Sequence, residues 1–219
     1  MGGLSIVINK EDLMAGYSLE DVNNIYFDVL KEIGNIGAGN ATTAIASMLQ
    51  IRLNMNVPKV QLLTFPELGS AVGGEEDQVV GIFLEVGSDI SGSMMFILTL
   101  ESAKFLVNKL MYREADAEVK FDEMEMSALK EIGNIITGSY LNALSSMTGL
   151  TITPSIPYIA IDMAAAILSV PAIEFGQYGD HALLIQTEFG DDVLIDGYFI
   201  LLPELESYAK ILSSLGIQM

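Results

Sequence analysis

Cysteine and tryptophan are absent from this 219-residue chain, and histidine occurs once, at position 181. Without cysteine the chain has no disulfide, no thiol nucleophile and no thiolate metal site. A single histidine also argues against a Ser-His-Asp triad, and His181 begins an apolar segment that predicts a strand. The absence of cysteine is compatible with a cytoplasmic location.

Basic residues are scarce as well: 10 Lys and Arg stand against 29 Asp and Glu, which gives a formal net charge of −19. An acidic surface repels phosphates, so nucleic-acid binding and docking to anionic membranes are excluded as main functions. No apolar segment is long and uncharged enough to span a bilayer, and the N-terminus lacks the pattern of a secretory signal. We therefore expect a cytoplasmic protein without membrane insertion.

The chain does contain a seven-residue segment that occurs twice. The run Leu30–Ile36, LKEIGNI, recurs unchanged at Leu129–Ile135, 99 residues later. At the same offset Pro58 matches Pro157. Two copies are too few for a solenoid, so the repeat predicts a pseudo-twofold domain built from two halves.

We expect residues 18–219 to form this single domain, with repeats at about 18–112 and 121–217. A polar, charge-rich connector joins the repeats. Residues 1–17 precede the domain as an extension, for which we expect disorder, the alternative being a short peptide that binds another protein.

Each repeat begins with a helix start signal, Ser18 in the first and Asp122 in the second. These signals predict helices at about 19–50 and 123–148, the second ended by Gly149. Strand-like segments follow at Val60–Leu63, Gln78–Glu85, Ser91–Thr99, Tyr158–Asp162, His181–Phe189 and Asp192–Leu201.

Each repeat should close with a short amphipathic helix, Leu100–Tyr112 and then Pro203–Leu215, with Pro203 in the first turn. The spacing of the strands resembles that of hairpins, so the pattern predicts an α+β fold with a largely antiparallel sheet. Gly37 and Gly39 weaken the first long helix by about 1 kcal/mol each relative to alanine, and we expect close helix packing to require them.

A polar ridge runs along each long helix. Asp28, Glu32 and Asn35 fall on one side of the first helix, within about 60° of one another. Ser127, Glu131 and Asn134 take the same places on the second helix. Asparagine is a poor helix former, so its repetition suggests a function, but packing inherited by duplication explains the ridge equally well.

A glutamate and an asparagine without a metal cluster suit one kind of chemistry. A carboxamide both donates and accepts hydrogen bonds and can orient a water for in-line attack on a phosphoryl group. A nearby glutamate can bind a lysine of a docked protein. The pair is adequate only if the substrate is a phosphorylated protein that carries its own metal.

The two motifs resemble those of the CheC family of chemotaxis phosphatases, related to CheX and FliY. The family motif is Asp or Ser, three residues, Glu, two residues, Asn, twenty-two residues, Pro. The series Asp28, Glu32, Asn35, Pro58 fits it, and so does the series Ser127, Glu131, Asn134, Pro157. The resemblance covers roughly residues 18–217.

The resemblance implies a phosphatase of the phosphorylated regulator CheY. Glu32 and Glu131 would bind a regulator lysine, and Asn35 and Asn134 would orient the water. Asp28 and Ser127 would support the interface with the partner, while Pro58 and Pro157 would shape the turn into the sheet. The protein would hold no metal of its own, because the regulator supplies Mg²⁺.

The resemblance also implies two long helices on one face of a sheet, and CheD as a further partner. Two motifs favour a CheC-like monomer over a CheX-like dimer, which carries one motif per chain. Two alternatives stay open: a non-catalytic adaptor that binds CheD or phosphorylated CheY, and a flagellar switch component. The missing FliY-like C-terminal domain argues against the second.

Overall fold

The protein is described here by a computed structural model that covers residues 24–55, 59–175, 181–190 and 194–215. Along the described chain the elements are α2 (Asn24–Leu49), β1 (Asn54–Met55), β2 (Lys59–Thr64), α3 (Phe65–Ala71), β3 (Gln78–Ser88), β4 (Gly92–Thr99), α4 (Leu100–Leu110), α5 (Glu123–Thr148), β5 (Ile152–Pro154), β6 (Tyr158–Met163), α6 (Ala164–Phe175), β7 (His181–Gly190), β8 (Leu194–Pro203) and α7 (Leu205–Ser214).

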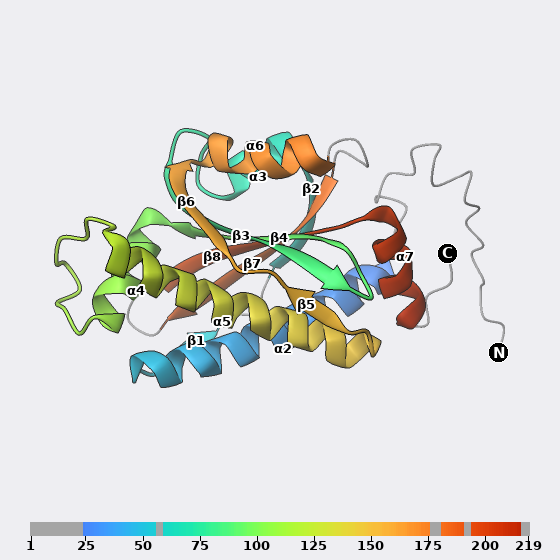
Figure 1. Cartoon of the computed structure of the whole chain (residues 1–219), viewed down its shortest axis with the longest axis horizontal. Coiled ribbons are helices and arrows are strands. Elements are labelled where there is room, and N and C mark those ends of the chain that lie inside the picture. The colour runs from blue at the N-terminus through green and yellow to red at the C-terminus, as the bar shows by residue number, and fades with distance from the viewer. Residues whose placement is uncertain (1–23, 56–58, 176–180, 191–193, 216–219) are drawn as a thin grey trace.

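These elements form three layers (Figure 1). An antiparallel sheet of eight strands, counted over the described residues, lies in the middle. The long helices α2 and α5 cover one face of the sheet and run in opposite directions, while α3 and α6 cover the other face. The predicted α+β class, with two long helices on one face of a largely antiparallel sheet, is confirmed.

The sheet interleaves the two repeats. Its order is β1-β7-β8-β4-β3-β5, with β2 also paired to β7 and β6 also paired to β3. Among the described strands, only the hairpins β3–β4 and β7–β8 join strands of the same repeat. The other ladders, β2–β7, β3–β6 and β4–β8 among them, join strands of different repeats. Each hairpin therefore pairs along its edges with strands that belong to the other repeat.

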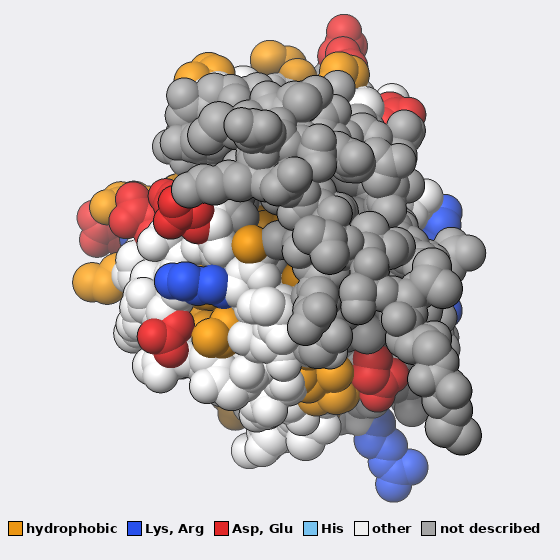
Figure 2. Space-filling model, turned by 90° about the vertical axis from the view of Figure 1, so that its right-hand side faces the viewer, with side chains coloured by type: hydrophobic (Ala, Val, Ile, Leu, Met, Phe, Trp, Pro, Cys, Tyr) orange, Lys and Arg blue, Asp and Glu red, His pale blue; other side chains and the backbone are white. Residues whose placement is uncertain are grey.

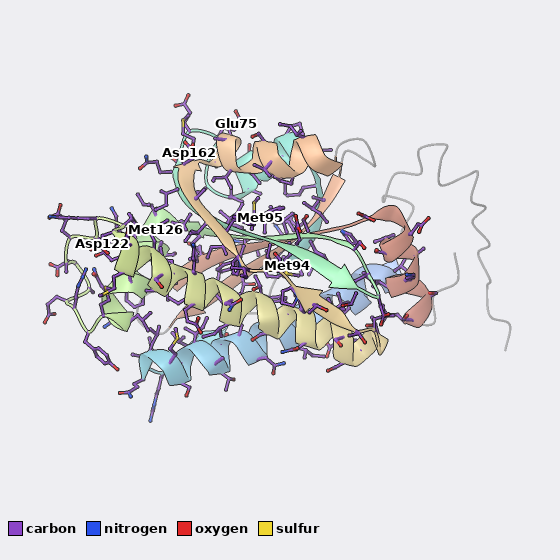
Figure 3. All side chains as sticks on the ribbon, viewed as in Figure 1. Glu75, Met94, Met95, Asp122, Met126 and Asp162 are labelled. Carbon is purple, nitrogen blue, oxygen red and sulfur yellow. The ribbon has the colours of Figure 1, made fainter. Side chains whose placement is uncertain are left out.

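Two hydrophobic cores lie on the two faces of this sheet, because successive strand side chains point in opposite directions. Met94 belongs to the core under α2 and α5, and its neighbour Met95 belongs to the core under α3 and α6 (Figure 3). All side chains from Ser93 to Leu98 are buried. Strand β4 is therefore apolar almost throughout, as expected of a central strand that is covered on both faces.

The ends of the second long helix agree with the prediction. Helix α5 spans Glu123–Thr148, and the Asp122 carboxylate accepts hydrogen bonds from the backbone N–H groups of Met124 and Glu125, both at 3.0 Å. Gly149 ends the helix in the left-handed conformation, with φ 70°. The first helix is described from Asn24 to Leu49, and its predicted cap Ser18 lies outside the described residues.

One predicted boundary is wrong. Pro203 does not open the last helix but closes β8, where it pairs with Gly92. Helix α7 begins at Leu205, after Glu204 in an extended conformation. Proline has a fixed φ that suits a first helical turn, but it also fits the end of a strand, where its missing N–H is not needed.

Helices α3 and α6 were missed, although α3 leaves a signal. At the start of α3, the Glu67 carboxylate accepts hydrogen bonds from the N–H and the hydroxyl of the preceding Thr64, each at 2.8 Å, in a Thr-x-x-Glu pattern. Residues 159–173 form one apolar run in the sequence, with no signal that separates its two elements. The structure divides this run between β6 and α6. Among the helices of the described ranges, none is long and apolar enough to cross a membrane.

Candidate functional site

The motif of the second repeat lies on the outer face of α5. The side chains of Ser127, Glu131 and Asn134 are all exposed there. Pro157, the last motif residue, is buried just before β6 begins at Tyr158. Three of the four motif residues are therefore accessible to a partner, and the proline is part of the packed turn into the sheet.

The motif of the first repeat takes the equivalent place on α2. The side chain of Glu32 is exposed and that of Asn35 is half-buried. Asp28 lies within α2, one turn before Glu32. Pro58 lies outside the described residues. The two helices end 99 residues apart, at Leu49 and Thr148, which is the same offset as that between the two motifs in the sequence.

The glutamate and asparagine side chains of the two motifs are free of hydrogen bonds within the described part of the chain. Within the described ranges, no hydrogen bond or ion pair engages the side chains of Glu32, Asn35, Glu131 or Asn134. Asparagine in a helix interior commonly bonds to nearby backbone groups, and neither asparagine does so here. Their carboxamides are thus available to a molecule outside the chain.

Close packing against the sheet holds both helices in place. A Cβ atom added at Gly133 of α5 would lie 2.6 Å from Cδ1 of Ile82 in β3. A Cβ atom at the equivalent Gly34 of α2 would lie 3.4 Å from Cγ2 of Ile185 in β7. Each helix therefore rests on a strand of the other repeat, with its motif asparagine one residue beyond the contact.

The contact between the two helices orients the motifs away from each other. A Cβ atom at Gly37 of α2 would lie 2.7 Å from Cδ1 of Tyr140 in α5, so this side of each helix faces its neighbour. Gly37 is about 170° round α2 from the centre of the first motif, and Tyr140 is about 150° round α5 from the second. The two motifs therefore occupy opposite flanks of the helix pair.

The packing predicted for the glycines of α2 is confirmed at one position and wrong at the other. Gly37 is required by the approach of Tyr140. A Cβ atom at Gly39 would meet nothing within 4 Å, so helix packing does not explain this residue. The same is true of its counterpart Gly138 on α5.

An ion pair between the exposed Arg113 and the buried Glu125 fixes the start of α5. Glu125, which is 2% exposed, accepts hydrogen bonds from Arg113 and from the backbone N–H groups of Lys120 and Asp122. Burial opposes ionisation of this carboxylate, but the hydrogen bonds outweigh it and lower its pKa. The connector between the repeats is thereby fastened to the helix that carries the second motif.

The described surface offers no metal site. No group of three or more His, Asp or Glu residues in the described ranges is arranged to hold a metal ion. The end of the molecule beside α7 carries acidic and basic side chains in separate small groups (Figure 2). His181 is the first residue of β7, in agreement with its prediction as a strand residue.

Comparison with known proteins identifies the family. The model of the CheC-like family matches residues 27–62 and 124–159. The CheY-P phosphatase CheC of Bacillus subtilis is 38% identical over 194 residues, which cover 86% of this chain and 93% of that protein. The chain belongs to the CheC-like family. The two matched segments contain the two motifs, from Asp28 to Pro58 and from Ser127 to Pro157.

Two further proteins are similar to this chain at lower identity. The flagellar motor switch phosphatase FliY of Bacillus subtilis is 22% identical over 144 residues, which cover 65% of this chain and 37% of that protein. The crystal structure of Thermotoga maritima FliY superposes with a TM-score of 0.68 at 22% identity, over 88% of this chain and 96% of that one. The roles of the individual motif residues stay a prediction.

Proposed function

We propose that this chain is a protein aspartyl-phosphate phosphatase that dephosphorylates the response regulator CheY. The observation that carries the proposal is the pair of Glu-x-x-Asn faces on α2 and α5, whose side chains are free and reachable. The name of the 38% identical relative, CheY-P phosphatase CheC, supports the choice of substrate.

In the proposed reaction, the regulator docks on one motif face and a lysine of the regulator pairs with Glu32 or Glu131. Asn35 or Asn134 then enters the regulator's active site and orients a water for in-line attack on phosphorus. The bond between phosphorus and the aspartyl oxygen breaks, which yields inorganic phosphate and a free aspartate carboxylate. Catalysis of this kind consists mainly of positioning and of stabilising charge.

The chain itself supplies positioning groups and no cation. Mg²⁺, bound by the regulator, would neutralise charge on the phosphoryl oxygens. Asp28 and Ser127, one turn before the glutamates, would contact the docked regulator, while Pro58 and Pro157 would shape the turn into the sheet. The opposite placement of the two motifs allows two regulators to bind one chain at the same time.

The test is the decay of phosphorylated CheY in the presence of Mg²⁺, with and without the protein. The parent chain should accelerate the decay, and the double variant Asn35→Ala/Asn134→Ala should lose about 100-fold of that acceleration, the usual cost of removing a positioning group. Asn40→Ala is the matched control: Asn40 is an exposed asparagine of α2, about 140° round from Asn35.

The adaptor alternative predicts a different result in the same experiment. If the chain binds phosphorylated CheY but leaves its half-life unchanged, with CheD also present, the phosphatase proposal is wrong and the motifs are docking surfaces. A double variant that works at the parent rate would reject the roles of the two asparagines alone.

Further proposals concern the partner CheD, the oligomeric state and the extent of the domain. We propose that CheD is a second partner and that the chain acts as a cytoplasmic monomer. We also propose that residues 18–219 form one folding unit, which the exchange of strands between the repeats supports. The flagellar switch alternative predicts that the protein co-purifies with the motor base.

A further inference from the structure

Five glycines lie inside the described parts of the two long helices, and three of them face a neighbouring element. A Cβ atom would clash with Tyr140 at Gly37 and with Ile82 at Gly133, and at Gly34 it would lie in ordinary contact with Ile185 at 3.4 Å. The remaining two, Gly39 on α2 and Gly138 on α5, occupy equivalent positions 99 residues apart. Glycine destabilises a helix interior relative to alanine, so both positions need a reason.

The fold gives no reason for these two glycines. In the described part of the chain, a Cβ atom at either position would have no heavy atom within 4 Å. Both residues have ordinary helical φ values and not the left-handed values that favour glycine. The residues on either side differ between the repeats, Ala38 and Asn40 in one and Thr137 and Ser139 in the other. Only the glycine itself recurs.

Both glycines adjoin a motif asparagine. Gly39 is four residues after Asn35, and Gly138 is four residues after Asn134. Residues at this spacing lie on one face of a helix, about 5–6 Å apart between Cβ positions. Each site thus consists of a free carboxamide followed, one turn later, by a helix backbone that carries no side chain and is partly exposed to solvent, although the Gly39 carbonyl also accepts a hydrogen bond from the Thr43 hydroxyl at 2.9 Å.

We propose that Gly39 and Gly138 are positioning residues, which let the docked regulator come against the bare helix backbone one turn beyond the asparagine. The inference rests on the proposed function and names a feature of the same sites. A side chain at this turn would hold the regulator farther from the helix. The carboxamide would then miss the water that it must orient, and a misplacement of about 1 Å can cost about 100-fold in rate.

The experiment compares the double variants Gly39→Ala/Gly138→Ala and Gly39→Gln/Gly138→Gln with the parent. Because the space is open and alanine favours helix, the alanine variant should melt at a higher temperature than the parent. Its acceleration of the decay of phosphorylated CheY should nevertheless fall about tenfold, mainly through a lower kcat, and the glutamine variant should lose more. A glycine required by the fold would give a lower melting temperature instead.

Matched controls separate size from position. Ser47 and Ser146 are exposed and equivalent, and each lies about 18 Å along its helix beyond the motif asparagine. Ser47→Gln/Ser146→Gln should keep the parent kcat and KM. Gly37→Ala should lower the melting temperature, because the new methyl group would meet Tyr140.

The outcomes distinguish this inference from the function on which it rests. If the parent accelerates the decay and both glycine variants match its KM and rate, the positioning role is wrong and the phosphatase proposal stands. A lower melting temperature for the alanine variant would also overturn the inference. If the parent gives no acceleration, the proposed function fails and the positioning role fails with it.

Discussion

Helices α2 and α5 are alike on the faces that they turn to solvent and unlike on the faces that they turn to each other. Both carry the Glu-x-x-Asn pair followed by an unpacked glycine. On the inner side, Gly37 of α2 corresponds to Ile136 of α5, and Ala41 of α2 corresponds to Tyr140 of α5. Small residues of one helix have thus become large residues in the other.

The difference follows from the pseudo-twofold arrangement. The antiparallel register that brings Gly37 against Tyr140 also brings Ala41 opposite Ile136. If both helices kept the same side chains here, two large residues would collide or two small ones would leave a cavity. An interface between two repeats of one chain can therefore diverge, while under the proposed function the outer faces stay alike because each would meet the same kind of partner.

The largest expected effect on stability comes from truncating Tyr140, the large residue of this interface. The Tyr140 ring stacks on Phe199 with centroids 4.2 Å apart, and its hydroxyl shares a 2.7 Å hydrogen bond with Thr187. Tyr140→Ala should lower the free energy of unfolding by about 4 kcal/mol, measured by urea denaturation. Ala41→Gly, at the equivalent position of α2, should cost about 1 kcal/mol. Equal losses would show that the two inner faces are equivalent after all.

A smaller effect is expected at the start of α5. Glu125→Ala removes the carboxylate that accepts hydrogen bonds from Arg113 and from the backbone N–H groups of Lys120 and Asp122, and the free energy of unfolding at pH 7 should fall by about 2 kcal/mol. Because burial and hydrogen bonds together leave the pKa of Glu125 below its ordinary value, the folded state binds the proton less well than the unfolded state. The stabilisation is therefore present above the ordinary pKa and lost as the pH falls through the folded one.

Unfolding curves from pH 7 down to pH 3 check this prediction. The parent should lose stability relative to Glu125→Ala as the pH falls, so that the two curves converge. Glu123→Ala, an exposed change in the same helical turn, is the control and should differ little from the parent. A difference between the parent and Glu125→Ala that does not depend on pH would rule out the charge of Glu125 as its source.

The smallest effect concerns the two sites themselves. Asn134 is exposed, whereas Asn35 is half-buried, so the second carboxamide is easier for a docked regulator to reach. Asn134→Ala should lower the rate of CheY dephosphorylation roughly twofold or more, and Asn35→Ala should lower it by less. Single variants with equal losses would show that the two sites contribute equally despite the difference in exposure.

Short-range patterns predicted much of this molecule. The capping pattern at Asp122 and the stop at Gly149 determine the ends of α5, because both act within one helical turn. The alternation and length of apolar runs located the main strands to within a few residues. Pro203 was misplaced because its fixed φ suits both a helix start and the end of a strand.

The candidate site was predictable in part. Both motifs were visible as a repeated spacing, and the helical period placed their polar residues on one side. Their freedom from internal hydrogen bonds was not predictable, because it depends on what the neighbouring elements leave uncovered. The same holds for the glycines of α2, which look alike in the sequence. A Cβ atom at Gly37 would clash with Tyr140, whereas a Cβ atom at Gly39 would meet nothing within 4 Å.

The sequence by itself therefore determined the two motif helices, the main strands and the antiparallel α+β class, since local hydrogen bonding and hydrophobic periodicity encode them. The tertiary structure alone decided that each repeat completes the sheet of the other, that α3 and α6 cover the second face, and that the motifs lie on opposite flanks of the helix pair. These features depend on which apolar faces can be buried together across about 100 residues of chain, and no short sequence pattern records that choice.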